Sequence, residues 1–593
     1  MDRGDGGWGA PVVWAALLAL LLLRAVVAFA PSMWAWGLNT QRFIPPLLAW
    51  IPWGAAALLL HPAIAGRVAP HLTRVGDRLA GGRFSPWLAA LTGAAVVWAF
   101  PDRLWITGDF LLRQGTAESG AFPNAFIQAL PIEVLLNRVG GLSSTNPNAA
   151  PRAIGAIAAA GLALVAVHLV RDWGLTGIAA VIGVGTIFLG GYLTSFTGLG
   201  KPAALICLAT ALCLLGAMRL VRSGRGAGLL GVTLGIAFLT HRSALALIPL
   251  WFATLAQLLV RRGSPGPRGR NLMIAGLIPV AGIAMAGPMI IGIVRHFDLP
   301  RHIAPHEVVR RGLLAAALAP LHLLDLTNLV LFFTPAVITA LVVFVCMGPR
   351  TARRAETWLI GLLALSFVPV LLFIHPIQGI FRDVEVFAPA GVAFALAAAY
   401  VTAAALQGGR LPAWLGPALL ASVLVPSLHS LALFNDAESG LRRGRSFATE
   451  APTRDEGELA QIWDVIAYRA FRMRDWEQAV EASAHAARYA PHPRALMMWA
   501  IARTYTGDHR GAESLYVSLT ERTADDPLVW VGLGGAALRA GDSVQTARAL
   551  ARLDAYAPDG REARAIRRHL QIFPEVWPST REVVGGEAGG TRR

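Results

Sequence analysis

Charged residues are scarce in this chain of 593 residues, because Asp, Glu, Lys and Arg make up 15 % of it, against about 25 % in ordinary soluble proteins. The scarcity is confined to residues 9–434, which consist mostly of long Leu, Ala, Val and Ile runs, whereas residues 436–593 have a soluble composition. A wholly water-soluble protein is therefore excluded. The composition predicts a membrane body that crosses the bilayer many times, followed by a soluble tail.

Cysteine and lysine are almost absent. The three cysteines lie within apolar runs and none lies in the tail, so neither a disulfide framework nor a cysteine metal site is expected. Lys201 is the only lysine. Most of the excess arginine behind the net charge of +16 lies in short loops, which indicates membrane orientation and not nucleic-acid binding. The tail also lacks G-x-x-x-x-G-K-[ST] and H-E-x-x-H, so nucleotide and zinc binding find no support there.

A helix needs about 20 apolar residues to cross a bilayer core of about 30 Å, and this criterion predicts about thirteen spans. Residues 226–260 are too long for one crossing, so we expect a hairpin of two short spans with His241 and Arg242 at its tip. Residues 312–326 are expected to form a re-entrant or interfacial helix. The predicted spans are 9–30, 43–61, 86–100, 152–170, 174–192, 202–220, the two within 226–260, 272–295, 327–347, 357–375, 386–406 and 412–434.

Arginine determines the predicted orientation. With a cytoplasmic N-terminus, four separate arginine clusters fall on the cytoplasmic side, as the positive-inside rule requires. An odd number of spans then places the tail on the opposite side. We therefore expect a multi-pass protein of the bacterial inner membrane with a periplasmic tail, and we expect Arg24, near the outer end of the first span, to snorkel. The clusters lie at 67–83, 219–225, 261–270 and 350–354.

The tail contains a repeat of about 34 residues between 460 and 558 that resembles the tetratricopeptide (TPR) pattern W-x2-L-G with a closing proline. The resemblance implies an α-solenoid of paired helices that binds a protein partner. Residues 561–573 would form a capping helix, and residues 581–593 are expected to be disordered. The residues expected to pack the repeats are Trp463, Trp499, Trp530, Leu533, Gly534 and Pro558.

The predicted fold is thus all-α, with a polytopic transmembrane bundle and a C-terminal solenoid. Four parts are expected along the chain. Residues 1–85 form an N-terminal transmembrane hairpin and an arginine-rich loop, and residues 86–435 form a transmembrane core with external loops. Residues 436–580 form the soluble repeat domain, and residues 581–593 form the tail end.

An acidic residue follows the third predicted span. Asp109 stands before an apolar Phe-Leu-Leu in a long external loop, ahead of an amphipathic helix over 125–139. Its carboxylate either caps a helix or acts at the membrane surface. The order of apolar span, acidic residue and interfacial helix resembles the GT-C class of polyprenol-dependent glycosyltransferases. The resemblance implies that Asp109 is the catalytic base, with Asp102 in reserve.

Two further segments resemble that class. In GVTLGIAFLTHRSALALIP (231–249), Arg242 stands before an apolar return helix, and in GIFRDVEVFAPAG (379–391), Arg382 stands at a span entrance. Lys201 also falls at an external span end. A lipid-phosphate sugar donor needs cations at the outer headgroup level to neutralise its leaving phosphate, so we expect these three residues to hold the donor phosphate. A D-x-D pair is absent from the first loop, so dependence on a divalent metal stays open. The expected accessory residues are His241, Arg301, His302, Arg310, Arg311 and Asp383.

The leading hypothesis is an integral membrane glycosyltransferase. It would transfer a hexosyl or pentosyl group from a polyprenyl-phosphate donor to a lipid, glycan or protein at the outer membrane face, while the TPR tail binds a partner or acceptor. One alternative is an O-antigen ligase or polymerase that uses the loop at 295–311, where His302, His306 and Glu307 could bind a metal. Another is a non-catalytic scaffold or transporter with an external protein-binding tail.

Overall fold

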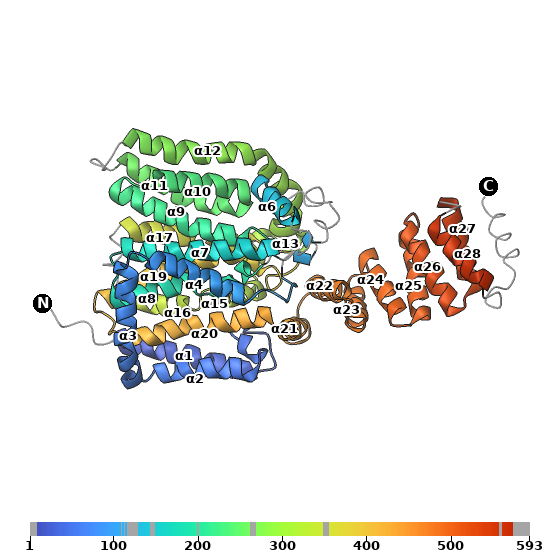
Figure 1. Cartoon of the computed structure of the whole chain (residues 1–593), viewed down its shortest axis with the longest axis horizontal. Helices are drawn as coiled ribbons and strands as arrows, with labels where there is room; N and C mark the ends of the chain where they lie inside the picture. The colour runs from blue at the N-terminus through green and yellow to red at the C-terminus, as the bar shows by residue number, and fades with distance from the viewer. Residues whose placement is uncertain are drawn as a thin grey trace. The chain divides into compact units, whose positions relative to one another are not determined.

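The computed structural model of the chain describes residues 9–107, 110–111, 113–114, 129–142, 149–198, 201–260, 268–347, 355–556 and 560–572. Regular secondary structure over these residues is entirely helical, as predicted (Figure 1). The chain divides into two compact units, Met1–Pro452 and Thr453–Arg593. The predicted boundary at 435/436 lies earlier, because one further helix, α21 (Ala437–Thr449), packs on the first unit.

The first unit is a bundle of apolar helices. Within the described residues, eight helical segments are long and apolar enough to cross a membrane, or ten if each of two bent pairs forms one span. The helices are α1 Gly9–Phe29, α2 Pro46–Leu59, α3 Pro62–Gly81, α4 Ser85–Ala99, α6 Pro131–Leu142, α7 Ala149–Asp172, α8 Gly177–Phe188, α9 Ala203–Ser223, α10 Ala227–Thr240, α11 Ile248–Val260, α12 Arg268–Ile293, α13 His306–Arg311, α14 Leu313–Ala317, α15 Pro320–Phe333, α16 Ala336–Met347, α17 Ala355–Ser366, α18 Val368–Phe373, α19 Ala388–Gln407 and α20 Leu415–Asn435.

Two segments differ from the predicted spans. Residues 62–81, predicted as a cytoplasmic loop, form the amphipathic helix α3, which lies at 96° to α2. Helix α15 begins inside the segment predicted to be interfacial and meets α16 at an angle of 92°. The predicted span 327–347 is therefore bent. The break falls at Thr334 and Pro335, because proline cannot donate the backbone hydrogen bond that would continue the helix.

The long apolar helices of the first unit lie side by side, so the bundle has two ends (Figure 1). At one end Arg219 Nε donates to Asp172 Oδ2 at 2.6 Å, which joins the C-terminal ends of α9 and α7. There Asn271 Nδ2 at the start of α12 also donates to the Gly224 carbonyl just after α9, at 2.8 Å. We call this the arginine-rich end, since two predicted cytoplasmic arginine clusters and Arg270 lie there. The opposite end is called the site end.

Helix α3 packs against α8 at the arginine-rich end through two glycines. A Cβ atom on Gly76 would lie 1.6 Å from the Gly177 carbonyl oxygen, so only glycine permits this approach. Gly177 has a φ of +53°, and its amide donates to Asp77 Oδ1 at 2.8 Å. This close backbone contact with α8 therefore stabilises α3 in its orientation across the end of α2.

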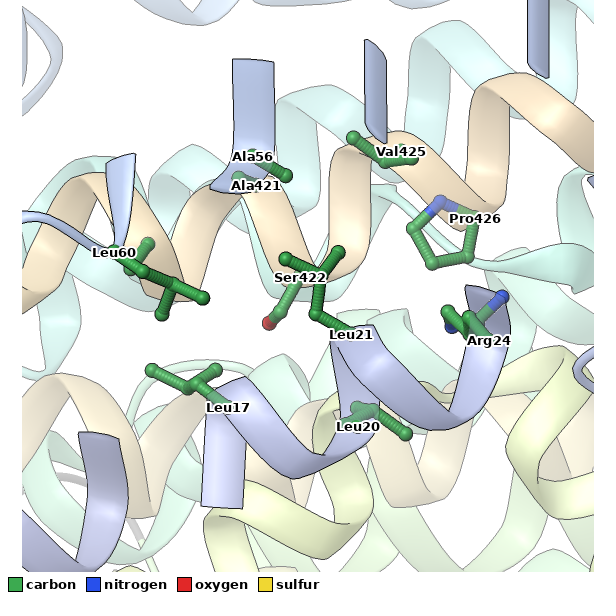
Figure 2. A pocket seen from close by; sticks show the side chains of 11 residues that line it. Leu17, Leu20, Leu21, Arg24, Ala56, Leu60, Ala421, Ser422, Val425 and Pro426 are labelled. Atoms are coloured by element: carbon green, nitrogen blue, oxygen red, sulfur yellow. The ribbon is translucent and has the colours of Figure 1, made fainter. Parts of the chain in front are cut away.

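Helices α1, α2 and α20 enclose an apolar cavity (Figure 2). Leu17, Leu20 and Leu21 of α1 face it, and Arg24 lies at its end. Leucine side chains at this spacing lie on one face of a helix, so these three line the cavity together.

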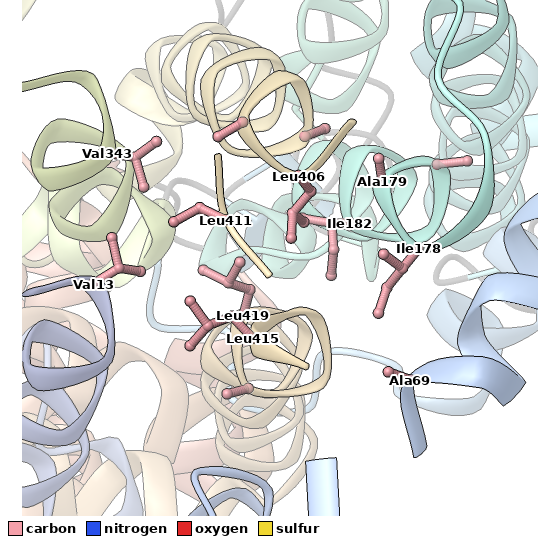
Figure 3. Close-up of a cluster of buried hydrophobic side chains, with 14 of the residues drawn as sticks. Val13, Ala69, Ile178, Ala179, Ile182, Val343, Leu406, Leu411, Leu415 and Leu419 are labelled. Carbon is pink, nitrogen blue, oxygen red and sulfur yellow. The ribbon is translucent and has the colours of Figure 1, made fainter. Parts of the chain in front are cut away.

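A buried apolar cluster ties the first helices to the last ones (Figure 3). Val13 of α1 and Ala69 of α3 belong to the same cluster as Leu415 and Leu419 of α20. Burial of Leu or Val side chains contributes about 1.5–3 kcal/mol each in water, but in a bilayer close packing carries more of the stabilisation. The remaining buried members are Leu17, Leu60, Val170, Leu175, Ile178, Ala179, Ala180, Ile182, Val343, Ala403, Ala405, Leu406, Leu411 and Ala418.

Helix α21 packs on the site end through an arginine and an aromatic residue. The Arg443 guanidinium is 5 % exposed and donates to the Trp36 carbonyl at 2.7 Å. It also lies 4.8 Å from the centre of the Phe381 ring. Phe447 stacks on Phe381, with ring centres 3.9 Å apart. These contacts explain why α21 belongs to the first unit although its composition is polar.

A second arginine pair holds the end of α21. Arg42, in the short helix η1 (Thr40–Arg42), donates to both carboxylate oxygens of Glu450, at 2.6 and 2.7 Å. Hydrogen bonding from Arg42 lowers the pKa of Glu450 below its ordinary value of 4.5. The pair therefore stabilises the fold above pH 4.5, and this contribution is lost as the pH falls through the lowered pKa.

Glu450→Gln is expected to reduce the acid sensitivity of the first unit. The wild-type melting temperature should fall more than that of the variant when the pH is lowered from 7 to below 4.5, because the variant has no carboxylate to protonate. Thermal denaturation of the full chain in detergent measures this difference. Glu438→Gln, an exposed carboxyl on the same helix, is the control. An unchanged acid response in Glu450→Gln would contradict the assignment.

Over its described residues, 453–556 and 560–572, the second unit has seven helices. Each packs against the next in sequence order, and Asp side chains cap several N-termini, as Asp475 does at 3.2 Å from the Gln478 amide. The first helices of successive pairs begin at Glu456, Pro493 and Pro527. The helices are α22 Glu456–Met473, α23 Trp476–Tyr489, α24 Pro493–Tyr505, α25 His509–Arg522, α26 Pro527–Ala540, α27 Ser543–Tyr556 and α28 Arg561–Ile572.

Most residues predicted to pack the repeats do lie inside this unit. Trp463, Trp530 and Leu533 are buried, and a Cβ atom on Gly534 would lie 2.7 Å from Ile566. Trp499 is half-buried. The predicted capping helix over 561–573 corresponds to α28. Pro558 and residues 581–593 lie outside the described residues.

Candidate functional site

A polar cavity lies at the site end, among segments that the sequence separates by almost 280 residues. Its empty space measures about 620 Å³ when the part open to solvent is included. Helix ends supply the lining, from the start of α9, the junction of α10 with η3 (Arg242–Leu247), the π-helical η4 (Val294–Ile303) and the start of α19. The lining residues are Arg113, Lys201, Pro202, Ala203, His241, Arg242, Ser243, Phe297, His302, Gln378, Asp383, Glu385, Val386 and Pro389.

Lys201 forms an ion pair across this cavity. Its Nζ donates to Glu385 Oε1 at 2.6 Å. The Lys201 side chain is 15 % exposed and that of Glu385 is 2 % exposed, so the carboxylate depends on this partner. Lys201 precedes α9, and Glu385 lies in η6 (Val384–Phe387) just before α19. Two predicted span entrances therefore meet at this pair.

Arg242 forms a second ion pair, with Asp298. Its Nη2 donates to Asp298 Oδ1 at 2.7 Å. Asp298 lies in η4, a ten-residue π-helix that continues α12. Helices of this kind are rare, and short π-helical turns are frequent at functional sites. Asp298 and His302 both lie on η4; the first contacts Arg242 and the second lines the cavity.

His241 sits beside Arg242 at the tip of the predicted hairpin. Its Nδ1 accepts the Ser243 amide at 3.2 Å, and its Nε2 lies 3.3 Å from Arg242 Nη1. Burial, together with the charges of Arg242 and Lys201, lowers the pKa of His241 well below its ordinary value. The imidazole is therefore neutral near pH 7 and adds no positive charge to the cavity.

A third ion pair joins Arg113 and Glu133. Both side chains are buried, at 5 % and 1 % exposed. Glu133 belongs to the interfacial helix predicted from the sequence, which the structure describes from Pro131 onward as α6. Sequence reasoning did not place Arg113, Glu133, Asp298 or Glu385 in the site. The sequence shows only that these charged residues lie beside apolar spans. It does not show which of them form pairs.

The positive charges of the cavity are paired with negative ones. Its three cations, Arg113, Lys201 and Arg242, each contact a carboxylate, and Asp383 adds a fourth acidic side chain, which is 3 % exposed. An anion could therefore reach one of these cations only by displacing its carboxylate.

Other predicted site residues lie elsewhere. Arg382 is half-buried beside Asp383 but does not line the cavity. Arg301 is exposed and its guanidinium lies 4.9 Å from the centre of the Phe297 ring. Arg310 and Arg311 are exposed on α13. The structure thus brings together Lys201, His241, Arg242, His302 and Asp383 from the predicted set.

The two residues predicted as candidate catalytic bases, Asp109 and Asp102, differ in what the structure describes of them. Asp109 lies outside the described residues. Asp102 is 5 % exposed, and its Oδ1 accepts the backbone amides of Leu104 and Trp105 at 2.8 and 3.2 Å. Its carboxylate therefore holds a turn after α4, and it is not among the residues that line the cavity.

Metal binding was left open by the sequence. Over the part of the chain that the structure describes, no group of three or more His, Cys, Asp or Glu side chains could hold a metal ion. The side chains of His306 and Glu307 are not among those described. The cavity residues do not by themselves provide a ligand set.

Comparisons with known proteins do not assign the chain to a family. No protein-family model matches it, and neither a curated protein nor a solved structure is similar to it. The function is therefore inferred from the cavity and the helical bundle.

Proposed function

We propose that this protein is an integral membrane glycosyltransferase that moves a sugar from a polyprenyl-phosphate donor. The observation that supports this proposal best is the cavity at the site end, where Arg113, Lys201 and Arg242 converge with Glu385 and Asp383. Loss of a phosphate leaving group builds negative charge, and preorganised cations stabilise that charge. Arginine can bind phosphate through two parallel hydrogen bonds, and lysine acts as a point charge.

A carboxylate would act as the base. Asp109 is the residue that the GT-C resemblance favours, and the cavity itself offers Asp383 and Glu385. A carboxylate released from its cation by the donor phosphate would accept the proton of the acceptor hydroxyl as the new glycosidic bond forms. The polyprenyl phosphate would leave with the electrons of the broken bond. Binding of the donor would thus release the carboxylate that activates the acceptor.

The site end would face the periplasm. If the shorter apolar helices α4, α8 and α10 also cross the bilayer, together with the eight long segments and the two bent pairs, the chain would pass thirteen times between the two ends. The positive-inside rule then favours a cytoplasmic position for the arginine-rich end. An odd number of passages would bring Thr453–Arg593 to the periplasmic side of a bacterial inner membrane.

The second unit would bind a protein or glycan acceptor. Each of its helices packs against the next, and the pairs begin at Glu456, Pro493 and Pro527, a spacing close to the 34 residues of TPR repeats. Stacked helix pairs of this kind provide extended binding surfaces. A partner protein is therefore the binding class that we propose for this unit.

Arg242→Gln is expected to reduce sugar transfer by about 10²- to 10³-fold, the loss seen when one preorganised group that stabilises developing charge is removed. The full chain in lipid nanodiscs would receive a panel of polyprenyl-phosphate sugars. Release of free polyprenyl phosphate, measured by mass spectrometry, reports transfer whichever sugar is used. Arg103→Gln, an exposed arginine beside the end of α20, is the control.

The same assay separates the competing functions. A ligase that uses the loop at 295–311 is favoured by His302, which lines the cavity. In that case His302→Ala would abolish activity, while Arg242→Gln would retain it. A scaffold or transporter would release no polyprenyl phosphate from any donor.

A further inference from the structure

The cavity between α1, α2 and α20 is separate from the polar one. Its empty space measures about 370 Å³ when the part open to the surroundings is included, and apolar side chains make up most of its lining (Figure 2). Ser422 of α20 and Arg24 of α1 are its polar groups, and the lining holds no acidic side chain. The other lining residues are Leu17, Leu20, Leu21, Ala56, Leu60, Ala418, Ala421, Val425 and Pro426.

Arg24 is buried at one end of this cavity. The residue is 3 % exposed, although a snorkelling side chain would extend away from the protein. The prediction that Arg24 snorkels is therefore wrong, because α20, remote in sequence, covers it. Its Nε and Nη2 atoms have no hydrogen-bond partner among the described residues. Burying an unpaired charge in an apolar interior costs free energy, and an anionic ligand bound to this guanidinium would offset that cost.

The surroundings of the cavity are suited to lipid. On α1, Leu22 and Val26 are 50 % and 65 % exposed, and on α2, Leu47 and Ile51 are 73 % and 65 % exposed. Exposed apolar side chains on a membrane helix face the acyl chains. Arg24 stands five residues before the end of α1, which places it about 7.5 Å below that end at 1.5 Å per residue. A headgroup phosphate at the site end is within reach of an arginine side chain from that depth.

We propose that this cavity binds one anionic phospholipid. Its phosphate would accept hydrogen bonds from Arg24, and one acyl chain would lie along Leu17, Leu20 and Leu21. A zwitterionic lipid would bring a second cation beside the guanidinium and would bind more weakly. Only part of that acyl chain would enter the space between the first and last helices of the bundle, and the rest of the lipid would lie in the surrounding bilayer. This inference does not depend on the proposed transferase activity.

Native mass spectrometry of the full chain, released from nanodiscs of phosphatidylglycerol and phosphatidylcholine in equal amounts, tests the proposal. The wild type should retain one phosphatidylglycerol after delipidation. Arg24→Gln should lower that retention at least tenfold, and Ala421→Leu should lower it by filling the cavity. Arg103→Gln, which removes an exposed arginine near the same end, should retain phosphatidylglycerol like the wild type. Melting curves in phosphatidylcholine nanodiscs show whether each variant is folded.

The opposite results would overturn the proposal. Equal retention of the two lipids by the wild type would show that the charge of Arg24 does not select the ligand. Retention of phosphatidylglycerol by folded Arg24→Gln would exclude Arg24 as the binding group. A third arm adds polyprenyl phosphate. If it displaces phosphatidylglycerol at equal concentration in an Arg24-dependent way, the cavity is a carrier-lipid site and the phospholipid assignment is wrong.

Discussion

Lys201→Met is expected to abolish sugar transfer and to destabilise the first unit. Lys201 is the partner of Glu385 Oε1 at 2.6 Å, and Glu385 is 2 % exposed, so the variant leaves an uncompensated buried carboxylate. Breaking a buried ion pair in this way costs about 3–5 kcal/mol. The loss is measured as a lower melting temperature of the full chain in nanodiscs. Release of polyprenyl phosphate measures the activity in the same preparation.

The double variant Lys201→Met with Glu385→Gln separates the two effects. Removing both charges restores much of the stability, because no buried charge then lacks a partner. Transfer should stay low, since the cation that would hold the phosphate is still missing. A double variant that regains both stability and transfer would assign Lys201 a structural role alone and would contradict its place in the proposed phosphate site.

Arg443→Ala is expected to lower the stability of the first unit by about 3 kcal/mol, from lost cation–π contacts and the space left behind. The guanidinium lies 5.8 Å from the Trp36 ring centre, 5.7 Å from that of Phe332 and 4.8 Å from that of Phe381. It also donates to the Trp36 carbonyl, which would lose its partner. Thermal denaturation of the full chain, followed by tryptophan fluorescence, gives the shift.

Neighbouring and conservative variants serve as controls. Arg442→Ala removes an exposed arginine from the same helix, and its melting temperature should change less. Arg443→Lys should rescue only part of the loss, because lysine lacks the planar group that stacks on rings. If Arg443→Ala melts like the wild type, the contacts of Arg443 with the rings of Trp36, Phe332 and Phe381 do not hold α21 in place.

Much of the fold could be predicted from the sequence because apolar length and arginine placement are local signals. The helical spans, the bent hairpin at His241 and Arg242 and the final helix α28 follow from such signals. Periodicity does not encode which helices become neighbours, so the thirteen predicted spans did not reveal that α15 and α16 meet at 92°. The bend depends on a single proline and on the packing around it.

The candidate site shows the same division. Lys201 and Arg242 could be selected because charges at span ends are rare, and both line the cavity. Their partners Glu385 and Asp298 could not be selected, because each pair is made by lateral packing of helices distant in sequence. Arg382 and Asp383 show that the sequence does not reveal which of two adjacent residues faces the cavity. They are adjacent in sequence, yet Asp383 lines the cavity and Arg382 does not.

The cluster that unites Val13 with Leu415 and Leu419 sets an order for biosynthesis. Contacts between α1 and α20 span most of the first unit, so they cannot form until the ribosome has produced the last membrane helix. Contacts at such separation slow folding, because the entropy of closing the chain is lost before they stabilise it. The first helix must therefore wait in the bilayer, with Arg24 uncovered, until α20 arrives to cover it. A lipid bound at Arg24 during that interval would be enclosed as the bundle closes.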